Sequence, residues 1–278
     1  MTHSLQVKPL STAVGAEVFG VNLLEPVSNE VIAQIRQIWL KHGVIFFRDQ
    51  PLDSDGFFAF AQRFGDIVEY PFVKGLPDHP LIIPVLKLPH ETHNFGGVWH
   101  SDTTYLDVPP AATMLIAREL PPVGGDTLFA SGYASYEGLS EGLKQTLKGL
   151  KAVNSSAKAV VTHSREDRMA DAPGKPAKSE FNSEHPVLRT HPESGRLSLY
   201  LNPGHTTRFV GWTEDESQGL LDYLFAHQIR PEYTCRFVWQ PSSIALWDNR
   251  CVLHNPINDY HGHKRLLHRI TLAGQIPV

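Results

Sequence analysis

Cysteine, positive charge and long apolar runs are all scarce in this chain, and each absence excludes a class of protein. The two cysteines among the 278 residues, Cys235 and Cys251, form no CxxC pair and therefore no cysteine-rich zinc site. The net charge of −4 argues against a general nucleic-acid-binding protein, which carries a basic excess. So little cysteine fits a reducing, cytoplasmic setting best.

No apolar stretch approaches the roughly 20 residues that a membrane-spanning helix requires. Residues 1–4 show no basic segment leading into an apolar run, so we expect no secretory signal and no membrane partner. Hydrophobic residues make up 41% of the sequence, and a chain of this length buries most of its apolar surface without disulfides. We therefore predict a single domain over residues 1–278.

The first part of the chain favours helices around one buried strand. A helix is expected to begin at Ser28 or Asn29 and to end at Gly43, and a second helix begins near Asp53. Between them, residues 44–47 are four apolar residues in succession, which predicts a buried strand.

From about residue 98 the pattern changes to short apolar segments separated by Pro and Gly turns. Many short strands of this kind predict a β-sandwich or barrel. Two helices interrupt them, one beginning at Ser140 and one at a capping box formed by Thr213 and Glu216. The expected strands lie at residues 113–117, 126–129, 197–201, 235–239, 243–247 and 269–272.

Residues 157–184 differ from the rest, because they are rich in Lys, Ser, Ala, Pro and Asp and weakly periodic. A long segment of this kind in a compact domain is either a lid over a site or a disordered insert. The sequence leaves both interpretations open.

His100 and Asp102 are two residues apart, so on a strand their side chains would point to the same side. A distant second histidine would complete a set of two imidazoles and one carboxylate. That set is typical of the facial triad of non-haem iron(II) oxygenases, which leaves coordination positions open. An isolated His-x-Asp is weak evidence among fifteen histidines, and its value depends on the residues around it.

Four histidines in the last quarter of the chain compete for the third position. His254 follows an apolar, strand-like segment, whereas His261 and His263 stand in a polar loop, where histidines are usually solvated. His268 lies in the final predicted strand and is expected to be a hydrogen-bonded core residue. We predict that His254 is the third ligand.

Arginines after His254 provide a candidate anion site. On a strand, positions 265, 267 and 269 share one face, so Arg265 and Arg269 would point the same way. A guanidinium binds a carboxylate through two parallel hydrogen bonds and stays charged. Thr127, in the Gly-Gly-Asp-Thr turn that enters a strand, offers a hydroxyl to the same carboxylate.

In combination, these motifs resemble the TauD/TfdA family of iron(II)- and 2-oxoglutarate-dependent dioxygenases. The resemblance covers nearly the whole chain, and the motifs occur in the family's order. The segments that carry it are residues 15–18, 20–23, 99–102, 124–127, 191–196, 247–254 and 265–269.

The resemblance implies a mainly β protein, a double-stranded β-helix or jelly roll with flanking helices. It implies that His100, Asp102 and His254 bind Fe(II), and that Thr127 and Arg265 bind the far carboxylate of 2-oxoglutarate. It also implies dioxygen as a substrate, succinate and CO2 as co-products, and a homo-oligomer, either a dimer or a tetramer.

Substrate identity is where the chain departs from the taurine-type pattern. Arg269 matches the position that holds the substrate's anionic head, but Tyr70, Val73 and Gly96 replace the other taurine-contacting residues. Taurine is therefore disfavoured. We expect another small anion, a sulfonate, a sulfate ester or a carboxylate such as an aryloxyalkanoate, with Arg269 and Tyr70 as substrate-binding residues.

Two other functions compete with this interpretation. A zinc-dependent hydrolase would use the same three ligands but has no use for Arg265 or Thr127. A non-catalytic jelly-roll binding module would use the histidines structurally. Halogenation is disfavoured, because it usually requires loss of the carboxylate ligand, and Asp102 is present.

Overall fold

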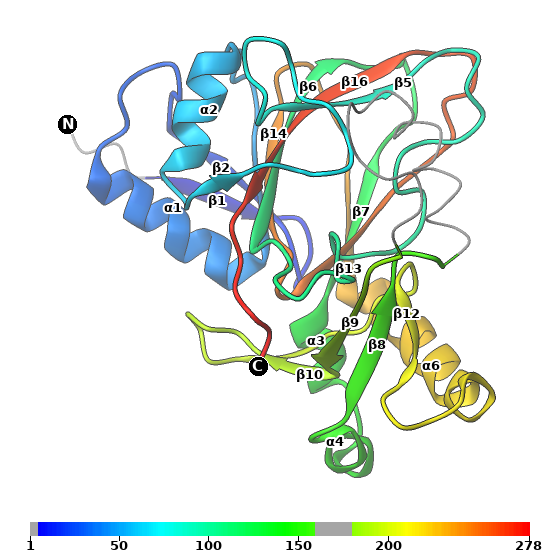
Figure 1. Ribbon diagram of the computed structural model, residues 1–278. Coiled ribbons are helices and arrows are strands. Elements are labelled where there is room, and N and C mark those ends of the chain that lie inside the picture. Colours follow the sequence, from blue (N-terminus) through cyan, green and yellow to red (C-terminus); the bar gives the residue numbers. More distant parts are fainter. Residues whose placement is uncertain (1–4, 159–179) are drawn as a thin grey trace.

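The computed structural model describes residues 5–158 and 180–278. Its centre is a sandwich of a large, mainly antiparallel sheet and a small antiparallel sheet (Figure 1). In order across the large sheet, the strands are β1 (Gln6–Pro9), β2 (Ala16–Phe19), β3 (Val44–Phe47), β14 (Ile244–Asp248), β6 (Ala112–Glu119), β16 (Arg265–Leu272) and β4 (Ile67–Val68), and β5 (Ile83–Lys87) also pairs with β16. Among the described strands of this sheet, only the β2–β3 pair is parallel. The strands of the small sheet are β13 (Thr234–Phe237), β7 (Thr127–Ser131) and β15 (Val252–Pro256).

Strand β3 shows why a continuous apolar run is needed at the centre of the large sheet. Val44 and Phe46 face the small sheet, where the ring of Phe46 stacks on Phe237 with centroids 3.9 Å apart. Ile45 and Phe47 face the opposite way, into the core under the helices. Both faces of the strand are therefore buried, as expected for apolar residues without alternation.

Two helices cover the outer face of the large sheet, α1 (Asn29–His42) and α2 (Ser54–Gln62). The hydroxyl of Ser28 accepts a hydrogen bond from the Val31 amide at the start of α1, and Gly43 ends that helix with a φ of 71°. Asp53 caps α2 in the same way. Both helix starts and the buried strand between them are confirmed.

A second layer lies beside the sandwich, shown at the lower right of Figure 1. It contains a three-stranded sheet with α6 packed on it and a core of its own. The predicted capping box of Thr213 and Glu216 is present at the start of α6. The elements of this layer are α3 (Gly132–Glu137), α4 (Glu141–Leu147), β8 (Lys151–Ser155), β9 (Asn182–Pro186), β10 (Leu188–Thr190), β11 (Leu197–Leu199), β12 (Thr206–Phe209), α6 (Glu214–Gln228) and the 3₁₀ turn Pro231–Tyr233.

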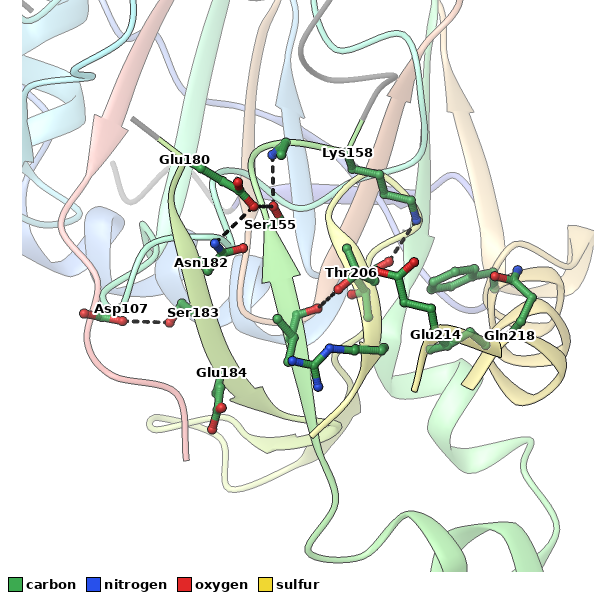
Figure 2. A pocket seen from close by; sticks show the side chains of 16 residues that line it. Asp107, Ser155, Lys158, Glu180, Asn182, Ser183, Glu184, Thr206, Glu214 and Gln218 are labelled. Atoms are coloured by element: carbon green, nitrogen blue, oxygen red, sulfur yellow. Dashed lines mark hydrogen bonds between the residues drawn. The ribbon is translucent and has the colours of Figure 1, made fainter. Parts of the chain in front are cut away.

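A polar cavity of about 930 Å³ opens between this sheet and α6 (Figure 2). Its wall carries carboxylates such as Glu180 and Glu214, and the ammonium of Lys158 donates to the Thr206 carbonyl at 2.9 Å. Most of residues 157–184, for which the sequence left a lid and a disordered insert open, lies outside the described residues. In the described ranges no helix has the length and apolar character needed to cross a membrane.

Candidate active site

His100 and His254 meet because their backbones pair directly. The His100 amide donates to the His254 carbonyl at 2.9 Å, and the His254 amide donates to the His100 carbonyl at 2.8 Å. Side chains of directly opposed residues lie on the same face of a sheet. The two imidazole rings are accordingly 4.1 Å apart, centroid to centroid.

Asp102 lies beside the two histidines, but a turn places it there rather than the predicted strand. His100 forms an isolated bridge rather than part of a strand, and residues 102–107 form turns and bends, with Thr103 at a φ of 42°. The expected strand alternation is therefore wrong at this point. Instead, the Asp102 amide donates to the side-chain oxygen of Asn249 at 3.4 Å, which ties the turn to the end of β14.

The three predicted ligands lie close together in a buried position. Oδ1 of Asp102 is 3.8 Å from Nε2 of His100 and 3.9 Å from Nε2 of His254. One ligand atom from each residue falls within 4.8 Å of the other two. This spacing places two nitrogens and one oxygen around a common point, as a small metal ion requires.

Hydrogen bonding fixes the orientation of His100. Nδ1 of His100 lies 2.7 Å from the Val98 carbonyl, an acceptor, so Nδ1 carries the proton and Nε2 presents its lone pair to the common point. Burial lowers the pKa of His100, and burial together with the proximity of His100 lowers the pKa of His254 well below its usual value. Both rings are therefore neutral near pH 7, which is the form that binds a metal.

The two oxygens of Asp102 have different partners. Oδ1 faces the histidines, whereas Oδ2 accepts a hydrogen bond from Thr113 at 2.5 Å and lies 3.1 Å from Nη2 of Arg269. Burial raises the pKa of Asp102. This effect is outweighed by the lowering effects of Arg269, the two histidines and the Thr113 hydrogen bond, so the net shift of the pKa is downward. Asp102 is ionised at all ordinary pH values.

Thr113 and Asn249 hold Asp102 in position, and neither residue was predicted from the sequence. The Asn249 side-chain amide donates to the Thr113 hydroxyl at 3.0 Å, and Thr113 in turn donates to Asp102. Asn249 also accepts from the Trp247 indole at 2.9 Å. Asn249 stands inside the recognised segment 247–254, but Thr113 lies in an ordinary strand whose sequence carries no signal of this contact.

The inner face of β16 carries the predicted cations. Arg265, Leu267 and Arg269 are all buried and alternate with the half-buried Leu266 and His268, as predicted for a strand. One cavity joins the triad to these residues and to Thr127. Its wall consists of Val85, Phe95, His100, Asp102, Leu115, Thr127, Trp247, His254, Pro256, Arg265, Leu267 and Arg269.

Thr127 and Arg265 line the same cavity as the triad, and Arg265 is four residues along β16 from Arg269, which contacts Asp102. The Thr127 hydroxyl accepts from the Trp239 indole at 3.0 Å, which leaves its own proton available to a ligand. In the described part of the chain, Nε and Nη2 of Arg265 have no hydrogen-bond partner although the residue is 4% exposed. A buried guanidinium with open donors is suited to an anionic ligand.

Tyr70 and Gly96 also border the site. The guanidinium of Arg269 lies 4.5 Å from the centre of the Tyr70 ring, so Tyr70 covers the predicted substrate cation. Gly96 has a φ of 72°, and a Cβ at this position would lie 2.8 Å from Cε1 of His100. Val73 packs against the aromatic cluster that contains Tyr70.

A second buried group with metal-ligating side chains, His191, Asp248 and Cys251, is explained by protein contacts. Both carboxylate oxygens of Asp248 accept from Arg250, at 2.8 and 2.7 Å, and His191 lies 3.0 Å from Oδ2. Burial raises the pKa of the Cys251 thiol well above its usual value, so the thiol is not a thiolate.

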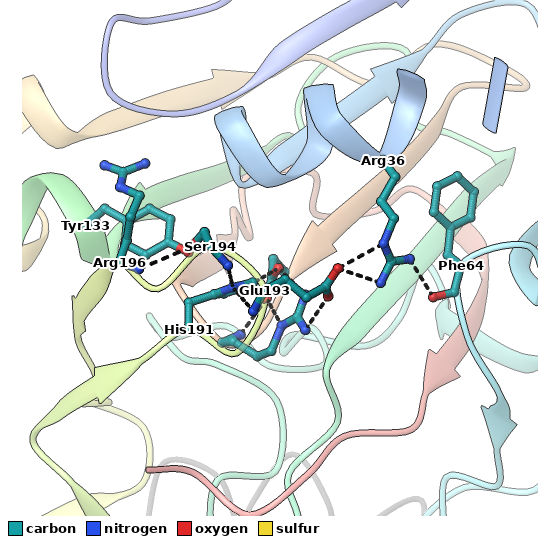
Figure 3. Close-up of polar contacts among 9 residues, drawn as sticks. Arg36, Phe64, Tyr133, His191, Glu193, Ser194 and Arg196 are labelled. Carbon is teal, nitrogen blue, oxygen red and sulfur yellow. Dashed lines mark hydrogen bonds and ion pairs between the residues drawn. The ribbon is translucent and has the colours of Figure 1, made fainter. Parts of the chain in front are cut away.

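The same contacts connect three distant segments (Figure 3). Nδ1 of His191 accepts the backbone amides of Glu193 and Ser194, so its proton is on Nε2 and is donated to Asp248. Glu193 then bridges Arg250 and Arg36, which is on α1, at 2.8 Å each. This network fixes the turn that precedes β15, and hence the strand on which His254 stands.

Comparison with known proteins agrees with this geometry. The chain matches the Taurine catabolism dioxygenase TauD, TfdA family over residues 6–271. The chain belongs to the TauD/TfdA family. The predicted family, the enzyme class of dioxygenase and the mainly β fold with a jelly-roll core are thereby confirmed.

Relatives that are named for an activity align with this chain over almost its full length. An alkylsulfatase of Acinetobacter baylyi is 34% identical over 99% of this chain and 87% of that protein. An alpha-ketoglutarate-dependent sulfate ester dioxygenase of Pseudomonas putida is 33% identical over 99% of this chain and 91% of that protein. The crystal structure of a taurine dioxygenase from Burkholderia xenovorans superimposes with a TM-score of 0.82 at 35% identity, covering 99% of this TauD/TfdA chain and 91% of that one.

Proposed function

We propose that this protein is an Fe(II)- and 2-oxoglutarate-dependent dioxygenase that hydroxylates a small anionic organic substrate, with succinate and CO2 as co-products. The observation that carries the proposal is one buried cavity that joins three metal-ligating atoms to two arginines. His100, Asp102 and His254 would hold the iron. The two arginines would hold two different anions, one on the co-substrate and one on the substrate.

The donor set fits Fe(II). Two neutral imidazoles and an ionised carboxylate occupy one side of the common point, which is the pattern of iron sites that keep positions open for other ligands. Thr113 and Arg269 occupy Oδ2 of Asp102 and so leave Oδ1 for the metal. When bound, the iron would activate dioxygen, the oxidant, with electrons from 2-oxoglutarate, and the protein would supply binding, orientation and exclusion of water.

Arg265 and Thr127 would bind the far carboxylate of 2-oxoglutarate. The open Nε and Nη2 of Arg265 provide parallel donors, and the Thr127 hydroxyl provides a third. Anchoring that end orients the keto acid end toward the triad. A 2-oxo acid without the far carboxylate would leave buried donors unpaired and bind more weakly.

Arg269 would bind the anionic head of the substrate. Its Nη2 contacts Asp102, and Tyr70 covers one face of its guanidinium. An anion held here places the carbon next to its head group beside the triad. For a sulfate ester, hydroxylation of the carbon that bears the ester oxygen gives a product that collapses to an aldehyde and free sulfate. The relatives named above as an alkylsulfatase and a sulfate ester dioxygenase favour this class over taurine.

The rival functions account for fewer of these contacts. A zinc hydrolase would use the triad but not the open donors of Arg265, and a binding module would use neither. We further propose a cytoplasmic location, which rests on the low cysteine content, and a homo-oligomeric state, a dimer or tetramer, which rests on the family resemblance.

Substrate screening tests the proposal directly. Anaerobically purified protein would be loaded with Fe(II) and supplied with 2-oxoglutarate, oxygen and a panel of sulfate esters, sulfonates and aryloxyalkanoates. We expect succinate formation coupled to substrate loss with one class, and no coupling in Asp102→Ala. Substrate loss that proceeds without oxygen or 2-oxoglutarate, with zinc in place of iron, would instead establish a hydrolase.

A further inference from the structure

Lys87 is a buried cation to which neither the sequence nor the proposed reaction assigns a role. It is the last residue of β5 and is 2% exposed. Within the described ranges its Nζ has no hydrogen-bond partner. A buried lysine without a hydrogen-bond partner is costly, because its charge has lost the solvation that water provides.

The register of the sheet places Lys87 next to Arg265. The two residues are direct partners in the antiparallel pairing of β5 with β16, so their side chains project from the same face. Both are buried on the inner side, where Ile83 and Val85 of β5 stand opposite Arg269 and Leu267. Like charges directly opposite each other destabilise a sheet, unless an anion compensates them.

Tyr260 is the shared neighbour of both cations. Nζ of Lys87 lies 4.3 Å from the centre of the Tyr260 ring, and the guanidinium carbon of Arg265 lies 5.8 Å from it. Tyr260 and the acids Asp126 and Asp259 raise the pKa of Arg265 against the larger lowering effect of burial. The ring therefore connects Lys87 to Arg265, which lines the cavity together with Thr127.

Among the residues that the structure describes, the carboxylates that interact with Arg265 do not compensate both cations. Asp126 is paired with Arg236 at 2.6 Å, and Asp259 is exposed and accepts the Gly125 amide at 2.8 Å. An exposed carboxylate contributes little because water screens it. The surroundings of Lys87 and Arg265 therefore retain an excess positive charge that a ligand carboxylate would balance.

We infer that Lys87 is a second cation of the far-carboxylate site, which acts beside Arg265 across the ring of Tyr260 and makes the protein select a 2-oxo acid with a second carboxylate. This inference rests on the proposed function. Lys87 is absent from the cavity wall. It is thus a positioning residue, which holds Tyr260 against Arg265. Its positive charge also attracts the ligand's carboxylate through a region of low dielectric constant.

Binding of two matched 2-oxo acids tests the inference without turnover. Calorimetric titrations of the anaerobic Fe(II)-loaded protein would compare 2-oxoglutarate with 2-oxopentanoate, which has a methyl group in place of the far carboxylate. For Lys87→Met we expect the Kd of 2-oxoglutarate to rise about tenfold and that of 2-oxopentanoate to change by less than about twofold. Lys87→Arg, which keeps the charge, should restore most of the preference.

The control variant is Lys264→Met. Lys264 precedes Arg265 in the chain, but it is partly exposed and pairs with Glu119 at 2.7 Å, so its loss should leave both Kd values unchanged. An equal change for both 2-oxo acids in Lys87→Met, or no change for either, would overturn the inference. Arg265→Met tests the proposed function separately: if it retains the wild-type preference for 2-oxoglutarate, the far-carboxylate site itself is wrong.

Thermal unfolding without any 2-oxo acid provides the second measurement. Removal of an uncompensated buried charge should raise the midpoint in Lys87→Met relative to the wild type. If Lys87 only packs on the Tyr260 ring, the midpoint should fall and the preference between the two acids should persist, which would also overturn the inference.

Discussion

Nη2 of Arg269 lies 3.1 Å from Oδ2 of Asp102, so one arginine contacts both a predicted metal ligand and the space predicted for the substrate's head group. The contact occupies the carboxylate oxygen that faces away from the histidines. Arg269 therefore helps to keep Asp102 ionised and to direct Oδ1 toward the metal. If the proposed sites are correct, we expect substrate binding and metal binding to be coupled through this ion pair.

Replacement of Arg269 by Gln should impair substrate binding more than metal binding. Loss of one partner of a buried charge pair costs about 2–5 kcal/mol, so we expect kcat/KM for the anionic substrate to fall at least about 30-fold. The Fe(II) affinity should fall less, because Thr113 still holds Oδ2 of Asp102. Steady-state kinetics and metal titration measure the two effects. A loss of iron affinity as large as the loss of kcat/KM would show that Arg269 serves the metal alone.

Thr113→Val should weaken metal binding without removing a ligand. The substitution deletes the hydroxyl that donates to Asp102 and leaves the Asn249 amide without its acceptor. Loss of a hydrogen bond that orients a metal ligand costs about 10–100-fold in metal affinity. Competition with a chelator of known affinity would measure the Fe(II) affinity of the variant.

Thr271→Val is the matched control for that substitution. Thr271 is the cross-strand partner of Thr113 and is also buried, but its hydroxyl has no hydrogen-bond partner in the part of the chain that is described. The Fe(II) affinity of the Thr271→Val variant should equal that of the wild type. Equal losses in both variants would attribute the effect to strand packing rather than to orientation of Asp102.

Gly96→Ala should disturb His100. The added Cβ would lie 2.8 Å from Cε1 of the imidazole, and the φ of 72° disfavours any L side chain by roughly 1 kcal/mol. We expect lower Fe(II) affinity together with reduced stability. Gly262→Ala separates the two effects, because Gly262 has a φ of 77° but open space around it. It should lose stability only, and a normal iron affinity in Gly96→Ala would show that His100 moves without cost.

Much of the fold could be predicted because its signals are local. Ser28, Gly43 and the Thr213 capping box mark helix ends through contacts within a few residues. The alternation of Arg265, Leu267 and Arg269 likewise follows from strand geometry alone. The candidate site was predictable where a motif concentrates its residues, as in the segment that ends at His254.

The contacts that tune the site depend on long-range pairing, which leaves no local signal. The His100 segment was expected to be a strand, but a turn places Asp102, and Asn249 from 147 positions along the chain holds it. Thr113 and Lys87 are single polar residues in strands. Their roles emerge only when the register places them beside Asp102 and Arg265.

The stability of the protein should fall between pH 6.5 and 4 in part because of His268. Burial and the neighbouring Arg118 lower its pKa from 6.5 to about 4, and Arg118 donates to its Nδ1 at 3.2 Å. Below pH 6.5 the unfolded chain therefore binds a proton that the folded protein does not. This difference lowers the free energy of unfolding as the pH falls, until the folded state also binds the proton near pH 4.

His268→Gln should flatten that dependence, since glutamine can accept the hydrogen bond from Arg118 but does not titrate. Urea unfolding at pH 7, 5.5 and 4.5 would measure the slope, and the variant should lose less stability than the wild type over this range. The control is His263→Gln, which replaces an exposed loop histidine and should keep the wild-type slope. Because His268 is only half-buried, solvent screens part of the effect, and the slope should change rather than vanish. An identical slope in His268→Gln would mean that the histidine binds its proton equally in the folded and unfolded chains.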